Sequence, residues 1–265
     1  TSILNILEDV RALSSSLILQ LNSSKNKAFE VIGSAFSKRV LDKKDLLRNA
    51  FLIPIDLHQN LFNDLETNSK SRADNLFIRI DTKSREINCS ILEIKCRSYL
   101  SEQEVEDLTI KMLEQIDNTI FALKKHFDPN HFKTKDRLDR EIKNQEFKNL
   151  LEFYIERAYR YKTLEEQSYR AYLDFIQTLD NGFTLKFNRL GFIFDFSFNQ
   201  KHFKQIFDNN TTIFRFGEGL IQQILDSNSD LNTSRLEENE LKKELIKSLD
   251  YNDKLKHFIG KYKTK

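Results

Sequence analysis

Residues 72–97 read RADNLFIRIDTKSREINCSILEIKCR, and this stretch decides the fold. Apolar side chains occupy both faces of the runs on either side of a polar turn, which predicts a β-hairpin buried in the centre of a sheet. The turn centres between residues 83 and 84, so antiparallel pairing places Asp74 opposite Glu93, within about one residue. Directly opposed side chains lie roughly 5 Å apart. Two carboxylates are therefore expected to meet inside an apolar sheet.

A lysine is expected to join this acid pair. Side chains alternate between the two faces of a strand, so Glu93 and Lys95 point the same way. Two close acids repel each other unless a cation lies between them, and Mg²⁺ and Mn²⁺ prefer such oxygen ligands. A lysine beside the ion can orient or deprotonate a water molecule, which is the equipment for metal-assisted phosphodiester hydrolysis. The alternative interpretation is a salt bridge between solvated strand charges.

The composition limits the class of protein. The chain has 265 residues, two prolines, six glycines and 31% charged residues, which is typical of a helix-rich protein with few long loops. It contains no apolar run of membrane-spanning length and no signal peptide, so we expect a cytoplasmic protein without membrane contact. The net charge is only +2, so any nucleic-acid binding has to come from a local basic patch. Because the sequence opens on Thr1, we expect an excised segment of a longer polypeptide.

The two cysteines argue against a metal–thiolate site. Cys89 and Cys96 fall on opposite faces of one predicted strand, so they cannot pair or share a metal, and both are expected to be reduced core residues. No glycine-rich phosphate loop is present, which argues against an ATPase on this chain.

The periodicity of apolar residues predicts an α/β (α+β) fold in which helices flank a mixed central sheet. Ser101 and Glu104 form a capping box that starts a long helix after the hairpin. We expect three regions: a core over 1–130, an α/β extension over 131–232 that packs on this core, and a charged helical tail over 233–265. The expected helices cover 3–21, 27–41, 101–126, 136–162, 164–179, 218–227 and 237–259, and the expected strands 51–56, 74–81, 87–96, 183–187, 191–198 and 212–216.

Four further polar residues have ordinary interpretations when each is taken alone. Glu30 reads as an exposed acid in the middle of a helix, and Gln115 as a hydrogen-bonding residue at the boundary of the long helix. Asp56 and His58, at the end of the first strand, read as structural. Basic residues that flank the hairpin are the better candidates for phosphate contacts with DNA: Arg72, Arg79 and Arg97.

Taken together, these residues resemble the PD-(D/E)XK nuclease superfamily. Asp74 matches its first acid and Glu93-Ile94-Lys95 matches its (D/E)-x-K element, while Ala73 stands where the name-giving proline would be. Glu30 and Gln115 fall on the helices before and after the hairpin, where that family carries an acid and, in several branches, a glutamine. The resemblance implies a restriction-endonuclease-like core and a metal-dependent DNA endonuclease.

The resemblance also implies a role for each residue. Asp74 and Glu93, with the backbone carbonyl of Ile94, would hold one or two Mg²⁺ (or Mn²⁺) ions, and Lys95 would position or deprotonate the attacking water. Glu30 would contribute to a second metal or a bound water. Gln115 would orient the surroundings of Lys95 or the DNA strand.

A closer similarity is to the nuclease regions of bacterial phage-defence proteins, of the DptH type found in phosphorothioation-dependent restriction. It is carried by residues 53–58, 72–76, 92–97 and 115–119 and continues at 151–154 and 157–158. The match is strong over about 27–127 and weak beyond about 200. The similarity implies a restriction or anti-phage role, DNA as a partner, and an ATPase or translocase in the same protein or complex. It leaves homo-oligomerisation open.

Two alternatives stay open beside the nuclease. The first is a catalytically silent, nuclease-like module that binds DNA or assembles a complex, for instance with Lys95 held in a buried salt bridge to Glu30. The second is a structural interaction domain whose helical tail binds a partner while the hairpin charges are incidental.

Overall fold

A six-stranded mixed sheet runs through the part of the chain that the computed structural model describes, residues 2–21, 23–58, 72–131, 138–207, 210–225 and 235–249. Its strand order is β1-β2-β3-β4-β6-β5, where β3, β4 and β6 are parallel and the other neighbours antiparallel. The strands are β1 (Phe51–Pro54), β2 (Asn75–Asp81), β3 (Glu86–Arg97), β4 (Thr184–Asp195), β5 (His202–Ile206) and β6 (Thr211–Phe216).

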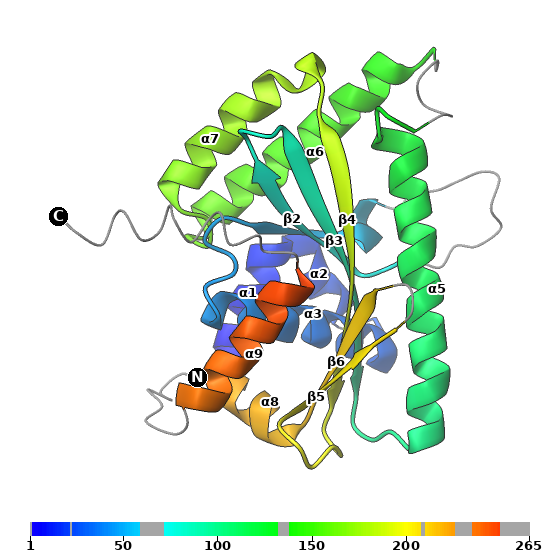
Figure 1. Cartoon of the computed structure of the whole chain (residues 1–265). Helices are drawn as coiled ribbons and strands as arrows, with labels where there is room; N and C mark the ends of the chain where they lie inside the picture. The colour runs from blue at the N-terminus through cyan, green and yellow to red at the C-terminus, as the bar shows by residue number, and fades with distance from the viewer. Residues whose placement is uncertain are drawn as a thin grey trace.

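Helices cover both faces of this sheet (Figure 1). One face packs against α1 (Ser2–Leu13), α2 (Ser15–Gln20), α3 (Lys25–Lys43), α8 (Glu218–Leu225) and α9 (Arg235–Ser248). The other face packs against α5 (Glu102–Phe127), α6 (Arg140–Arg160) and α7 (Glu166–Gln177). Two 3-10 turns, η1 (Ile55–His58) and η2 (Leu179–Asn181), complete the described elements. The predicted α/β class, a mixed sheet flanked by helices, is confirmed.

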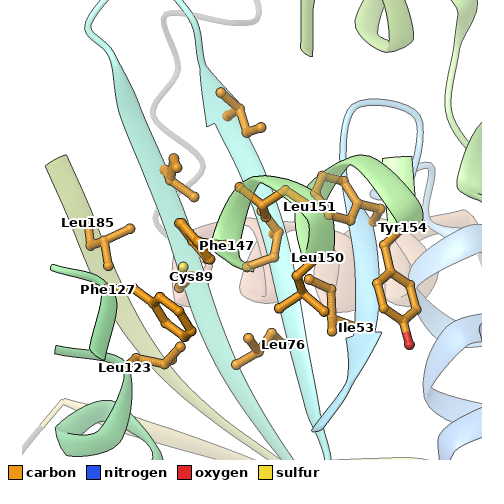
Figure 2. Packing of buried hydrophobic residues seen from close by; sticks show 14 of the residues in the cluster. Ile53, Leu76, Cys89, Leu123, Phe127, Phe147, Leu150, Leu151, Tyr154 and Leu185 are labelled. Atoms are coloured by element: carbon orange, nitrogen blue, oxygen red, sulfur yellow. The ribbon is translucent and has the colours of Figure 1, made fainter. Parts of the chain in front are cut away.

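The hairpin is central, as its two apolar faces predicted. Six of the seven residues of β2 are buried, and β3 is buried from Ile87 to Ile94. Figure 2 shows Leu76 and Cys89 from this hairpin in one apolar cluster with Phe147, Leu150 and Leu151 of α6. Cys96 lies in the apolar cluster on the opposite face, and both cysteines are free and buried, as expected.

Several predicted elements differ from the structure in their extent. The first helix divides because Ser14 takes an extended conformation (φ −164°) between α1 and α2. The two strands predicted from 183 to 198 form one strand, β4, which runs through Gly191. β5 was not predicted, because its exposed edge position leaves it without a continuous apolar face. The capping box at Ser101 and Glu104 is confirmed and starts α5.

The segment after residue 130 completes the central sheet. β4 lies parallel to β3 along the whole of β3 and separates it from β6. The predicted domain boundaries at 130 and 232 stay predictions, and residues 59–71, 226–234 and the tail beyond 249 lie outside the described residues. Leu241, Leu245 and Leu249 of the tail are buried in the cluster around α3, so this part of the tail is built into the core.

Among the described residues, no helix combines the length and the apolar character needed to cross a membrane.

Gly33 allows α3 to lie close to the hairpin. A Cβ atom at Gly33 would stand 2.9 Å from Ile94 Cγ2 and 3.3 Å from Cys96 Cβ, both on β3. Such contacts are closer than van der Waals packing permits, so any larger residue would push α3 away from the sheet. Glu30 lies one turn earlier on the same helix, so this contact also sets the position of Glu30.

We expect Gly33→Ala to lower the free energy of unfolding by about 1–3 kcal/mol because of this overpacking. Gly219→Ala is the matched control, since a Cβ there comes no closer than 3.9 Å to any atom outside the helix. Alanine has the higher helix propensity, so the control is expected to be neutral or to stabilise by up to about 1 kcal/mol. Urea denaturation of both variants measures the difference, and equal stability would contradict the account of α3 packing.

Candidate active site

The strand register brings Asp74 beside Glu93. Asn75 pairs with Leu92 at the end of the β2–β3 ladder, so the next position places Asp74 opposite Glu93, as predicted. The Asp74 N–H donates to Glu93 Oε2 (3.2 Å), and the Ile94 N–H donates to Asp74 Oδ2 (2.7 Å). Glu93 is fully buried and Asp74 is partly buried. The two carboxylates therefore share one enclosed spot on the face of the sheet that α5 covers.

Burial and mutual repulsion make both carboxylates weak acids. Burial raises the pKa of Asp74 to about 6, against the opposing effects of the Lys95 charge and the Ile94 N–H, and the negative charges of Asp56 and Glu30 add to the rise. Burial also raises the pKa of Glu93 well above its ordinary value, and the charge of Asp74 raises it further. A cation at this spot would relieve both effects.

Lys95 supplies such a positive charge. Its Nζ donates to Glu93 Oε1, and only 15% of its side chain is exposed. Burial by itself would lower the pKa of Lys95, but the charges of Glu93 and Asp74 outweigh it and raise the pKa above the ordinary lysine value. Lys95 is therefore an ammonium that acts as an internal counter-ion, and the predicted convergence of the three side chains is confirmed.

A second charged group lies on the more exposed side of Asp74. Lys27 Nζ stands 2.6 Å from Glu30 Oε2 and 3.6 Å from Asp56 Oδ2. These three side chains are 43%, 37% and 31% exposed, in that order, so solvent reaches them while Glu93 is sealed. Because Glu30 and Asp56 both raise the pKa of Asp74, they lie within electrostatic range of the acid pair. The structure thus brings the predicted Glu30 towards the site.

Asp56 and Lys27 are the candidate residues that sequence reasoning missed. Asp56 lies in η1, two residues beyond the end of β1, and the Ile55 N–H donates to the carbonyl of Asp74 (2.9 Å), so η1 starts where Asp74 lies. The position of Asp56 near Asp74 could have been inferred from the pairing of β1 with β2, because the last paired residues, Pro54 and Asn75, lie close to them in the sequence. Lys27 carried no signal, because its position depends on how α3 packs. His58, interpreted as structural, contacts the buried Tyr154 hydroxyl through Nε2 (2.8 Å).

Gln115 contacts the segment that carries Asp74 into the site. Its Nε2 donates to the carbonyl of Arg72 (2.9 Å), and the Ala73 N–H donates to Thr119 Oγ1 (2.8 Å), one turn further along α5. Both bonds fix the backbone just before Asp74. The structure gives Gln115 a positioning contact to this backbone, and the predicted roles towards the surroundings of Lys95 or a DNA strand stay predictions.

The predicted arginine contacts divide into two groups. Arg72 and Arg79 are only 9% and 6% exposed, so their burial speaks against direct contacts with a DNA backbone. Arg79 also lies two strand positions from Phe77, which packs in the cluster on the α3 face, away from Asp74. Arg97 is partly exposed and shares the strand face of Glu93 and Lys95. Of the three predicted arginines, Arg97 therefore stays a candidate for contact with a DNA phosphate.

The acid pair fits a small divalent cation of the oxygen-preferring kind. Mg²⁺ binds through one or two protein carboxylates and keeps several of its waters, so Asp74 and Glu93 are a sufficient set of side chains. Within the described ranges, no three His, Cys, Asp or Glu side chains form a ready metal cluster. An ion held by this pair would have to replace the Lys95 ammonium on Glu93. The predicted role of the Ile94 carbonyl stays a prediction, as does the metal itself.

Comparisons of the chain with protein-family models, with curated proteins and with solved structures give no match.

We expect Asp74→Asn to stabilise the protein when no divalent ion is present, and increasingly so as the pH rises from 4 to 7. The pKa of Asp74 is 3.8 ordinarily and about 6 in the fold, so the folded state binds more protons than the unfolded state between these values. Stability is therefore lost as the pH rises, by up to about 3 kcal/mol, and asparagine removes this loss.

Asp81→Asn is the control of opposite sign. Burial would raise the pKa of Asp81, but the N–H groups of Ser84 and Lys83 outweigh it and lower the pKa. Its charge therefore stabilises the fold at every pH above the ordinary pKa of 3.8, so the variant should be less stable than the wild type by a nearly constant amount from pH 4 to 7. Urea denaturation in EDTA at pH 4, 5.5 and 7 measures both trends, and a destabilised Asp74→Asn at pH 7 would overturn this electrostatic account.

Proposed function

We propose that the protein is a Mg²⁺-dependent deoxyribonuclease that cuts DNA internally. The observation that carries this proposal is the convergence of Asp74, Glu93 and Lys95 on one enclosed face of a central sheet. The order of α3, β1, the hairpin and α5 supports it, because it agrees with the core that the PD-(D/E)XK resemblance implies.

Asp74 and Glu93 would hold the metal ion, which when bound polarises the phosphate and lowers the pKa of a water molecule. The chain itself contributes a fixed geometry, because the Ile94 N–H holds the Asp74 carboxylate and α5 holds the backbone before it. Lys95, once its Nζ is released from Glu93, can hold the attacking water and stabilise the negative charge that develops on the phosphate. Hydrolysis joins the water oxygen to phosphorus, and the bond to the leaving sugar oxygen breaks as that oxygen takes a proton.

Glu30, Asp56 and Lys27 would act at the exposed side of this site. Lys27 has both carboxylates as partners and keeps a large exposed fraction, so its ammonium can reach a phosphate that approaches Asp74. Glu30 and Asp56 add negative charge near the acid pair, which favours a cation there. These roles extend the predicted part of Glu30 in holding a second metal or a bound water.

The wider setting is proposed from the resemblance. The protein would act on DNA in the cytoplasm of a bacterium, within a restriction or anti-phage system. An ATPase or translocase in the same complex would deliver the DNA, since the hairpin site offers no means of moving along it.

A catalytically silent module is the second candidate, and one observation favours it. Lys95 lies directly on Glu93, so the site in this structure is neutralised without a metal. The same fold would then bind DNA or a partner and leave the phosphodiester bond intact.

A plasmid-nicking assay with Mg²⁺ or Mn²⁺ separates these two candidates. We expect the wild type to convert supercoiled plasmid to the open-circular form, and Asp74→Asn, Glu93→Gln and Lys95→Met each to lose at least about 100-fold in rate. Glu141→Gln and Lys111→Met, exposed residues of α6 and α5, make the same changes of charge elsewhere and should retain the wild-type rate.

Circular dichroism establishes that each variant is folded, so that loss of rate reports on chemistry. If the wild type fails to nick with either metal, alone and with its partner proteins, the silent module becomes the better description. The nuclease proposal is also contradicted if the three site variants cut DNA as fast as the two control variants.

A further inference from the structure

The carboxyl ends of β3, β4 and β6 meet at one edge of the sheet, next to the start of α5 (Figure 1). In open sheets with parallel strands, ligands bind beyond this kind of edge. Register places Lys95, Ile193 and Arg215 side by side across the three strands, so their side chains share the face that carries Glu93. Arg97 follows Lys95 by two residues on that face. Three basic side chains therefore lie on one face between the candidate active site and the edge, and two of them are already paired there, Lys95 with Glu93 and Arg215 with Asp195.

These cations are held at fixed places by their surroundings. Arg215 donates through Nε (3.0 Å) and Nη2 (2.5 Å) to one oxygen of the fully buried Asp195. The other Asp195 oxygen accepts from the backbone and the hydroxyl of Ser197. Arg97 donates through Nη1 to the carbonyl of Cys96 (2.8 Å). Adjacent strands are about 4.8 Å apart and residues about 3.3 Å apart along a strand, so the Cα atoms of Arg97 and Arg215 lie roughly 7 and 10 Å from that of Lys95.

Two exposed aromatic rings flank this row of cations. Tyr99 is 68% exposed and follows Arg97 at the end of β3, and Phe203 is 51% exposed and pairs with Arg215 in the ladder of β5 with β6. The loop that carries Tyr99 is tied to the end of β4, because the Leu100 N–H donates to Ser197 Oγ (3.3 Å). Both rings are thus presented from anchored backbone. Single exposed aromatic residues are common, but two that flank fixed arginines match a particular kind of ligand.

We propose that this edge holds a single strand of DNA whose bases are unpaired, with a phosphate on Arg97 and bases stacked on Tyr99 and Phe203. Basic grooves with aromatic platforms bind single strands in this way, because every base has a face that can stack. Duplex DNA hides its bases and offers these rings nothing to stack on. The inference deepens the proposed function and rests on it for the identity of the strand as DNA. It makes a DNA end, gap or opened segment the substrate that reaches Asp74 and Glu93.

The test is fluorescence anisotropy in EDTA, with a labelled single-stranded oligodeoxynucleotide and with the duplex of the same sequence. The wild type should bind the single strand more tightly than the duplex. The double variant Tyr99→Ala/Phe203→Ala should weaken single-strand binding by at least about tenfold. The ring-preserving pair Tyr99→Phe/Phe203→Tyr should bind like the wild type. The double variant Leu19→Ala/Ile142→Ala, which removes exposed apolar side chains from α2 and α6, should also bind like the wild type.

The salt dependence tests the cations separately. Arg97→Gln should lower the slope of log affinity against log salt by about one phosphate contact, about 0.7 for a single strand. Equal binding by the wild type and the alanine pair would overturn the inference and leave the edge as a surface for a protein partner. Tighter binding of the duplex would also overturn it.

Binding in EDTA does not depend on cleavage, so the two proposals can fail separately. If the variant Tyr99→Ala/Phe203→Ala loses single-strand binding and the wild type fails to nick with any metal, the single-strand site is supported and the nuclease proposal is contradicted. If this variant binds and cuts like the wild type, the nuclease proposal is supported and the single-strand site is contradicted.

Discussion

The close approach of two carboxylates inside an apolar sheet is the constraint on which the rest of this structure depends. Asp74 and Glu93 are fixed by the register of the central hairpin, and each is linked to the other's strand through a backbone N–H. This position stabilises neither ionised carboxylate, because burial and the repulsion of nearby negative charges raise the pKa of both acids. A fold that keeps such a pair gives up stability for it, which is the usual mark of a functional site.

Positively charged side chains lie beside these carboxylates and the carboxylates near them. Lys95 neutralises the buried acid pair, and Lys27 does the same for the more exposed Glu30 and Asp56. The two lysines therefore act as tethered counter-ions in the absence of a metal. Under the proposed function, a metal ion and a phosphate would replace these two lysines when DNA binds. Gly33 and the contacts of Gln115 and Thr119 hold the helices that make the arrangement rigid.

The part of the site that lies within one hairpin could be predicted from the sequence, because strand pairing and side-chain alternation are local rules. They placed Asp74, Glu93 and Lys95 together, and the capping box located the start of α5. Contacts between distant segments could not be predicted in the same way. Lys27 reaches the site only because α3 packs closely at Gly33, and the burial of Arg72 and Arg79 depends on helices that the local pattern does not place. β5 escaped prediction because an exposed edge strand needs no apolar face.

We propose that Asp74 and Glu93 form a divalent cation site that the Lys95 ammonium occupies when the metal is absent. Anomalous X-ray diffraction from crystals grown with Mn²⁺ tests this claim most directly. The account predicts a manganese peak at about 2.0–2.6 Å from an oxygen of each carboxylate, Lys95 Nζ withdrawn from Glu93, and no such peak in Asp74→Asn crystals. At saturating Mn²⁺, an ordered site without a peak and with Lys95 still on Glu93 would contradict it.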